Sequence, residues 1–151
     1  LINGDFSSQQ FDPLRGWRLG GGQGYTVEVD EGRLRVDFQG EHNVNLARPS
    51  QTVPLRGSAR IALQGRWKGE QVTTRSGVYM EIVLHCAQES PRFTTEDRYK
   101  SWTWQEFSLA FDYSDDCHAA TVRLRRQRTN ALDNKIGGTV WLDDLKLEPR
   151  T

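Results

Sequence analysis

Residues 25–38 read YTVEVDEGRLRVDF, and this stretch decides the fold class. Apolar and polar residues alternate through residues 25–30 and again through residues 33–38, with Glu31-Gly32 between them. Alternation with a period of two is typical of a strand with one buried face, and a short turn containing Gly joins two such strands into a hairpin. The stretch therefore predicts a β-hairpin that turns at Glu31-Gly32.

The same alternation continues through the rest of the chain. It recurs over residues 58–67, 78–86, 104–111, 120–127 and 139–147. In the last segment the phase slips by one residue at Asp143-Asp144, which indicates a bulge or a bend. No segment shows a helical stripe, and Gly and Pro separate the strands. We expect one all-β domain, a jelly-roll sandwich of two antiparallel sheets, with a long surface loop over residues 87–101.

Composition restricts the classes of function. Lys plus Arg and Asp plus Glu both number 20 in the 151 residues, so the formal net charge is zero and bulk charge does not hold a polyanion. Aromatic residues make up 10% of the chain, with five Trp, which predicts a folded core. No apolar run reaches the roughly 18 residues of a membrane span. The chain begins with Leu1, so we expect a processed chain or a piece of a larger protein.

The two cysteines, Cys86 and Cys117, lack the spacing of a zinc site. They either form one disulfide or remain as two buried thiols. We favour the disulfide, because the other indications below place the chain outside the cytoplasm.

The two ends of the chain carry a family resemblance. The chain opens with LINGDFS at residues 1–7, reaches Gly16-Trp17 nine residues later, and closes with VWLDDLKLEP at residues 140–149. These ends resemble the galactose-binding-like jelly roll of carbohydrate-binding modules, especially the xylan- and glucan-binding families. The resemblance implies a noncatalytic sugar-binding module appended to a larger extracellular, periplasmic or cell-envelope protein. It covers the whole chain in strand order, but only the two ends are specific.

The resemblance also implies a structural calcium ion near the last strand. Asp144 or Asp143 is the predicted ligand, and Asp5 is a weaker candidate. Ser7 departs from the family pattern, which often has Glu at this position. The alternative is that both aspartates of the last strand cap loop amides.

The residues on the outward phase of the middle strands predict the ligand face. Sugars are bound by aromatic rings that stack on their C–H faces and by planar polar groups that hold hydroxyls. The first candidates belong to three strands with a consistent phase: Tyr79, Glu81, Trp104, Glu106 and Arg123. The second group comprises Arg66, His85, Arg125, Trp102 and Trp141. The alternative is a solvated face of cross-strand ion pairs, and we expect Trp17 and Trp67 to lie in the core.

Residues 123–128 contain four Arg, which favours an anionic glycan over a neutral one as the partner. No nucleic-acid motif accompanies them, so we predict no nucleic-acid binding and no membrane insertion. The His residues show no metal-ligand spacing, and no nucleophile motif occurs. Glu81 and Glu106, if they lay on neighbouring strands, would be the carboxylate pair that glycoside cleavage needs. We predict a binding module rather than an enzyme; the alternative is a structural or protein-interaction accessory domain without a sugar ligand.

Overall fold

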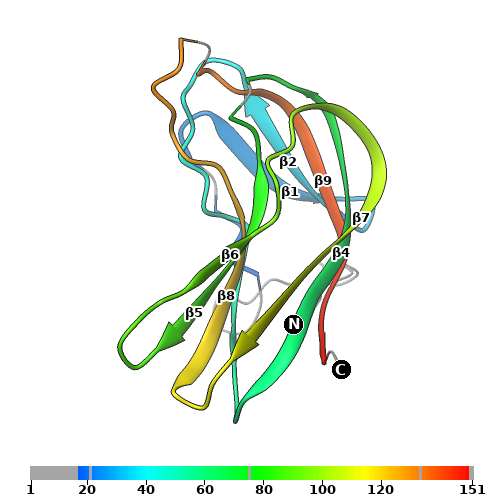
Figure 1. Cartoon of the computed structure of the whole chain (residues 1–151). Helices are drawn as coiled ribbons and strands as arrows, with labels where there is room; N and C mark the ends of the chain where they lie inside the picture. Colours follow the sequence, from blue (N-terminus) through cyan, green and yellow to red (C-terminus); the bar gives the residue numbers. More distant parts are fainter. Residues whose placement is uncertain (1–16, 21, 75, 133, 150–151) are drawn as a thin grey trace.

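The computed structural model describes residues 17–149 except 21, 75 and 133. The described residues form nine strands in two antiparallel sheets and contain no helix, which confirms the all-β sandwich (Figure 1). The five-stranded sheet has the order β1(Tyr25–Asp30), β2(Arg33–Gln39), β9(Gly137–Pro149), β4(Ala59–Val72) and β7(Lys100–Tyr113). The four-stranded sheet has the order β3(Ser50–Pro54), β8(Cys117–Arg125), β5(Tyr79–Cys86) and β6(Arg92–Thr94). No described helix is long and apolar enough to cross a membrane.

The hairpin turns where the sequence predicts. Asp30 pairs with Arg33, so Glu31 and Gly32 form a two-residue loop with φ angles of 53° and 75°. Positive φ at both loop residues matches the right-handed twist of the two strands. The hairpin prediction is confirmed.

The phase slip in β9 is a bulge. Asp143 pairs with Arg66 and Lys146 pairs with Gln64, so β9 has one residue more than β4 between these pairs. Asp144 has a φ of 53° and an exposed side chain, and this extra residue lets the apolar phase of the strand continue into the core afterwards.

A second bulge, in β7, overturns one predicted ligand residue. Trp67 pairs with Gln105 and Gly69 with Trp102, so the phase of β7 shifts between these pairs and Trp102 turns inward. The Trp102 side chain is 6% exposed and meets the Trp67 ring edge-on with ring centroids 5.5 Å apart. Gly69 makes this position available, because a Cβ there would lie 2.2 Å from the Trp102 ring. Trp102 therefore belongs to the core rather than to the rim of a groove.

Both sheets contribute to one hydrophobic core, which includes Trp17 and Trp67 as predicted. A disulfide joins Cys86 of β5 to Cys117 of β8, which confirms the favoured pairing. The expectation of a single long loop over residues 87–101 was wrong, because β6 pairs with β5 within it and β7 already begins at Lys100. The opening motif of residues 1–7 lies outside the described residues.

Candidate functional site

The predicted ligand residues divide between the two sheets. Tyr79, Glu81 and His85 lie on β5, and Arg123 and Arg125 on β8, all in the four-stranded sheet. The remaining outward candidates lie on the five-stranded sheet: Arg66, Trp104, Glu106 and Trp141. The prediction of one continuous face was therefore wrong. Alternation identifies the outward side chains of a strand, but it does not identify the sheet to which the strand belongs.

The same division separates Glu81 from Glu106. Glu81 is 2% exposed on the four-stranded sheet, whereas Glu106 is exposed on the five-stranded sheet. The two carboxylates therefore do not lie on neighbouring strands and do not face one another across a groove.

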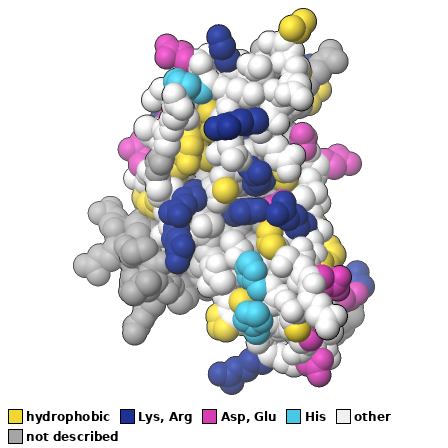
Figure 2. Space-filling view, turned by 90° about the vertical axis from the view of Figure 1, so that its left-hand side faces the viewer, with side chains coloured by type: hydrophobic (Ala, Val, Ile, Leu, Met, Phe, Trp, Pro, Cys, Tyr) yellow, Lys and Arg dark blue, Asp and Glu magenta, His cyan; other side chains and the backbone are white. Residues whose placement is uncertain are grey.

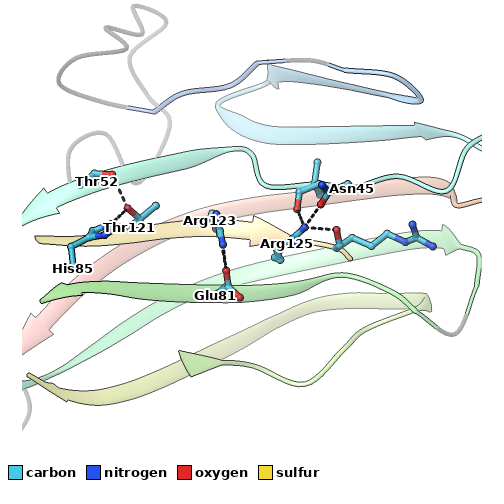
Figure 3. A network of polar contacts seen from close by, with 9 residues as sticks. Asn45, Thr52, Glu81, His85, Thr121, Arg123 and Arg125 are labelled. Carbon is cyan, nitrogen blue, oxygen red and sulfur yellow. Dashed lines mark hydrogen bonds and ion pairs between the residues drawn. The ribbon is translucent and has the colours of Figure 1, made fainter. Parts of the chain in front are cut away.

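The centre of the four-stranded face is an ion pair between neighbouring strands. Glu81 pairs in register with Arg123, and the Arg123 Nε donates to Glu81 Oε1 over 2.7 Å (Figure 3). The Arg123 side chain is 21% exposed, so one side of the pair is buried and the other borders solvent. The buried carboxylate holds the Arg123 guanidinium in one position, and a hydrogen-bonding ligand can reach its solvent-facing side.

Arg125 lies at one end of this face and is tied to a loop. Its Nη1 donates to Asn45 Oδ1 over 2.5 Å and to the carbonyl of Leu46 over 2.9 Å (Figure 3). Its Nε is buried and has no hydrogen-bond partner among the described residues. In the register Arg125 is opposite Tyr79, so the loop contact also fixes a cation beside an aromatic ring.

A chain of hydroxyl and imidazole groups lies at the other end of the face. His85 Nε2 is 2.8 Å from Thr121 Oγ1, which is 2.8 Å from Thr52 Oγ1 (Figure 3). These groups come from β5, β8 and β3, and together they extend the polar surface across three strands.

A cavity of about 490 Å³ opens on this face, within the range typical of ligand sites. Its lining includes Tyr79 and Glu81 of β5 and Arg92 and Thr94 of β6. Loop residues complete it: Ser76, Gly77, Asp97, Gln127, Arg128 and Thr129. These loop residues could not be predicted from the sequence, because alternation carries no information about the loops that fold over the end of a sheet.

Burial changes the acid–base behaviour of two groups in this cavity. It raises the pKa of the Tyr79 hydroxyl, and the negative charge of Glu81 raises this pKa further. Tyr79 therefore keeps its proton near neutral pH and offers both a ring and a hydroxyl donor. Burial also raises the pKa of the Asp97 carboxyl.

The lining of the cavity contains two arginines and two carboxylates. Arg92 and Arg128 line it, and neither has a carboxylate partner among the described residues. Figure 2 shows a band of basic side chains across the face of the molecule on the side of the four-stranded sheet. The positive charge is local, because the chain as a whole is neutral.

On the outer face of the five-stranded sheet the aromatic rings contact cations of the chain itself. Trp104 has the guanidinium carbons of Arg33 and Arg66 within 5.3 and 5.2 Å of its ring centroid. Trp141 lies in the same way against two cations, Arg35 at 5.6 Å and Lys68 at 5.0 Å. These distances are those of cation–π contacts, which compete with a sugar for the ring faces.

The two aspartates of β9 contact arginines. Asp143 Oδ2 lies 3.8 Å from Arg33 Nε and 3.6 Å from Arg66 Nη2, and Asp144 Oδ2 lies 2.8 Å from Arg66 Nε. Burial is the main reason why the pKa of Asp143 is raised. Guanidinium groups supply the positive charge that calcium would supply, so Asp143 and Asp144 do not fit a calcium site on their own. Asp5 lies outside the described residues, and calcium remains a prediction.

Sequence reasoning also missed the role of Arg126. Its side chain is fully buried, and burial lowers its pKa. In the sequence it is one member of a run of arginines. The one signal that separates it is its phase: it directly follows the end of β8 and continues the inward phase of Val122 and Leu124.

Comparison with known proteins shows the fold. No protein-family model and no curated protein sequence matches the chain. Among solved structures, a carbohydrate-binding module of family 4 matches with a TM-score of 0.66 and 14% identity, covering 98% of both chains. A family 61 module in complex with β-1,4-galactotriose matches with a TM-score of 0.55 and 19% identity, covering 99% of this chain and 97% of that one. A family 16 module matches with a TM-score of 0.53 and 14% identity, covering 89% and 92%. The chain therefore has the jelly-roll fold of carbohydrate-binding modules.

Proposed function

We propose that the chain binds an oligosaccharide or polysaccharide, without a covalent step, on the outer face of the four-stranded sheet. The observation that carries this proposal is the cavity in which Tyr79 lies beside the buried Glu81–Arg123 pair. The shared fold supports it, because a module of this fold is solved with a bound galactotriose. Fold alone does not define function, so the residues of the site carry the argument.

Each group in the cavity has a physical role in this proposal. The ring of Tyr79 stacks on the C–H face of a sugar unit. Glu81 lies beneath the surface and fixes Arg123, whose partly exposed guanidinium donates hydrogen bonds to sugar hydroxyls. His85 and Thr121 extend these polar contacts along the same face. Because the face is open, much of the ligand stays hydrated, and we expect a Kd on the order of 10 µM to 1 mM.

The glycan in this proposal is anionic. Arg92 and Arg128 line the cavity without a carboxylate partner among the described residues, and Arg123 beside it already neutralises Glu81. Arg binds a sugar carboxylate through two parallel hydrogen bonds, which a neutral hydroxyl does not reproduce. A glycan that contains uronic acid units has this chemistry.

The chain acts in this proposal as a noncatalytic module of a larger protein outside the cytoplasm. The Cys86–Cys117 disulfide supports such a location, because disulfides persist mainly in oxidising compartments. The other domains of that protein would be its remaining partners.

Calorimetric titration of the intact chain with matched neutral and uronate-containing oligosaccharides tests the proposal. We expect the uronate-containing ligands to bind more tightly, and their affinity to fall as salt is added. Tyr79→Ala should weaken binding at least about tenfold, whereas Tyr79→Phe should retain most of it because the ring remains. Arg128→Gln should weaken binding of the anionic ligand alone, with Arg60→Gln, an exposed arginine of the other sheet, as the matched control. Binding of no glycan would favour the accessory-domain alternative.

A further inference from the structure

A second, smaller cavity lies at the edge of the proposed site. It has a volume of about 270 Å³, and we call it the Tyr25 pocket. Its lining consists of Gly22, Gln23, Tyr25, His42, Asn43, Val44, Asn45 and Arg128. Arg128 also lines the larger cavity, so the two cavities adjoin at this side chain.

The Tyr25 pocket depends on two glycines of the loop before β1. A Cβ at Gly22 would lie 2.7 Å from the Tyr25 ring, and a Cβ at Gly24 would lie 2.7 Å from the Cβ of His42. Gly24 also has a φ of 91°, which other residues rarely adopt. Gly22 and Gly24 therefore let this loop pass closely beside Tyr25 and His42.

Buried Arg126 holds the walls of both cavities in place. It donates to Asn43 Oδ1 over 3.1 Å and to the Val44 carbonyl over 2.8 Å, on the side of the Tyr25 pocket. It also donates to the carbonyl of Ser76 over 2.9 Å, on the side of the larger cavity. One guanidinium thus fixes the two cavities relative to each other, which reduces the entropy lost when a ligand spans them.

The Tyr25 pocket retains unused polar groups. His42 Nδ1 is buried and has no hydrogen-bond partner among the described residues. Outside the lining, the Nε of Arg125, whose Nη1 donates to Asn45, is also buried without a partner among these residues. A buried polar atom without a partner is costly, and a water molecule or a ligand usually satisfies it. Apart from Arg128, the polar groups of the lining are neutral amides, an imidazole and a phenol, which suit hydroxyl groups.

We propose that the Tyr25 pocket is a second subsite, which takes a hydroxyl-bearing end unit of the same glycan whose anionic units lie over the larger cavity. Arg128 lies between the two subsites and faces a carboxylate of the glycan where the larger cavity meets the Tyr25 pocket. This inference rests on the proposed function, and it adds that the ligand is a chain bound near its end rather than a single sugar.

A length series of uronate-containing oligosaccharides, titrated into the intact chain, tests this subsite. Affinity should rise about tenfold at the length at which a unit first reaches the Tyr25 pocket. Tyr25→Ala and His42→Ala should remove this gain for the longer ligands and leave the Kd of the shorter ones unchanged. Glu28→Ala, an exposed position on the same strand as Tyr25, is the matched control and should change neither value.

The outcomes distinguish the two proposals. Two outcomes overturn the second subsite and leave the proposed function intact. In the first, binding depends on Tyr79 but not on ligand length. In the second, the pocket variants weaken the binding of short and long ligands equally. Binding of no ligand at any length overturns both. If a variant unfolds, the ring resonances of His42 in the wild-type chain replace it as the readout. They should shift with long ligands alone, and an unchanged His42 signal with long ligands would falsify the subsite.

Discussion

On the outer face of the five-stranded sheet, Trp104 and Trp141 each lie against two cations of the chain itself, whereas on the outer face of the four-stranded sheet Tyr79 borders a cavity. Both faces contain aromatic and arginine residues on outward positions. They differ in the cations left without a carboxylate: on the five-stranded face Arg66 contacts two aspartates, whereas at the cavity of the four-stranded face, where Arg123 is paired with Glu81, Arg128 has no carboxylate partner among the described residues. Residue type alone therefore does not define a binding face. A binding face also needs side chains that are not already paired with other groups of the chain.

The largest expected difference in stability is between variants of Glu81 and Glu106, which lie on different faces of the molecule. Glu81→Ala removes the partner of the partly buried Arg123, and we expect a loss of about 3 kcal/mol in the free energy of unfolding. Glu106→Ala, at an exposed position, should change it by less than about 0.5 kcal/mol. Urea denaturation of both variants measures the contrast, and equal losses would contradict the assignment of Glu81 as the buried member.

The next effect concerns ligand binding by the aromatic residues. Tyr79→Ala should weaken glycan binding at least about tenfold, or about 1.4 kcal/mol. Trp104→Ala and Trp141→Ala should change affinity less than about twofold, and each should instead lose about 1 kcal/mol of stability with its cation contacts. Titrations and thermal melts of the three variants separate these effects. A large loss of affinity in Trp104→Ala would make the five-stranded face a site as well.

A smaller effect should follow from pH. Asp97 and Asp143 both have pKa values raised by burial, so their ionised forms oppose folding at neutral pH. As pH falls through these raised values toward the ordinary pKa of Asp, the penalty is relieved and both groups add stability. Only Asp97 lines the cavity, so its protonation should also tighten binding of an anionic glycan a few-fold. Asp97→Asn should remove that part of the pH dependence of the Kd, and Asp143→Asn should not.

The smallest effect concerns calcium and the five-stranded face. Asp144 is engaged by Arg66, so Asp144→Asn should leave any stabilisation by calcium unchanged. Melting temperatures of wild type and variant, with calcium and after chelation, give this comparison. A response to chelation in wild type alone would assign a calcium ligand to Asp144 despite its arginine contact.

The strands and their phases could be predicted because they follow from local patterns. Glu31-Gly32 defines its own turn, and the break at Asp143-Asp144 shows the bulge directly in the sequence. The sheet to which each strand belongs depends on long-range pairing, so Trp104 and Tyr79 could not be separated in advance. Trp102 was misplaced because the bulge that turns it inward lies in β7 and depends on the close approach permitted by Gly69.

The site could be predicted in part for the same reason. Tyr79, Glu81 and Arg123 lie together because their phases on two adjacent strands agree. The loop residues of the cavity, such as Asp97 and Arg128, follow no periodic pattern. Tertiary contacts fix such loops, as where Arg126 donates to the carbonyl of Ser76.

The hydrogen bonds of buried Arg126 to the surrounding loops have a consequence for protein engineering. Its side chain donates mainly to backbone carbonyls, including those of Val44, Ser76 and Asn134, so the loops it holds depend little on the identity of their exposed side chains. Exposed positions near these contacts, such as Gln127 and Asn130, can therefore be randomised while Arg126 is kept. A library built in this way would vary glycan selectivity on a constant scaffold.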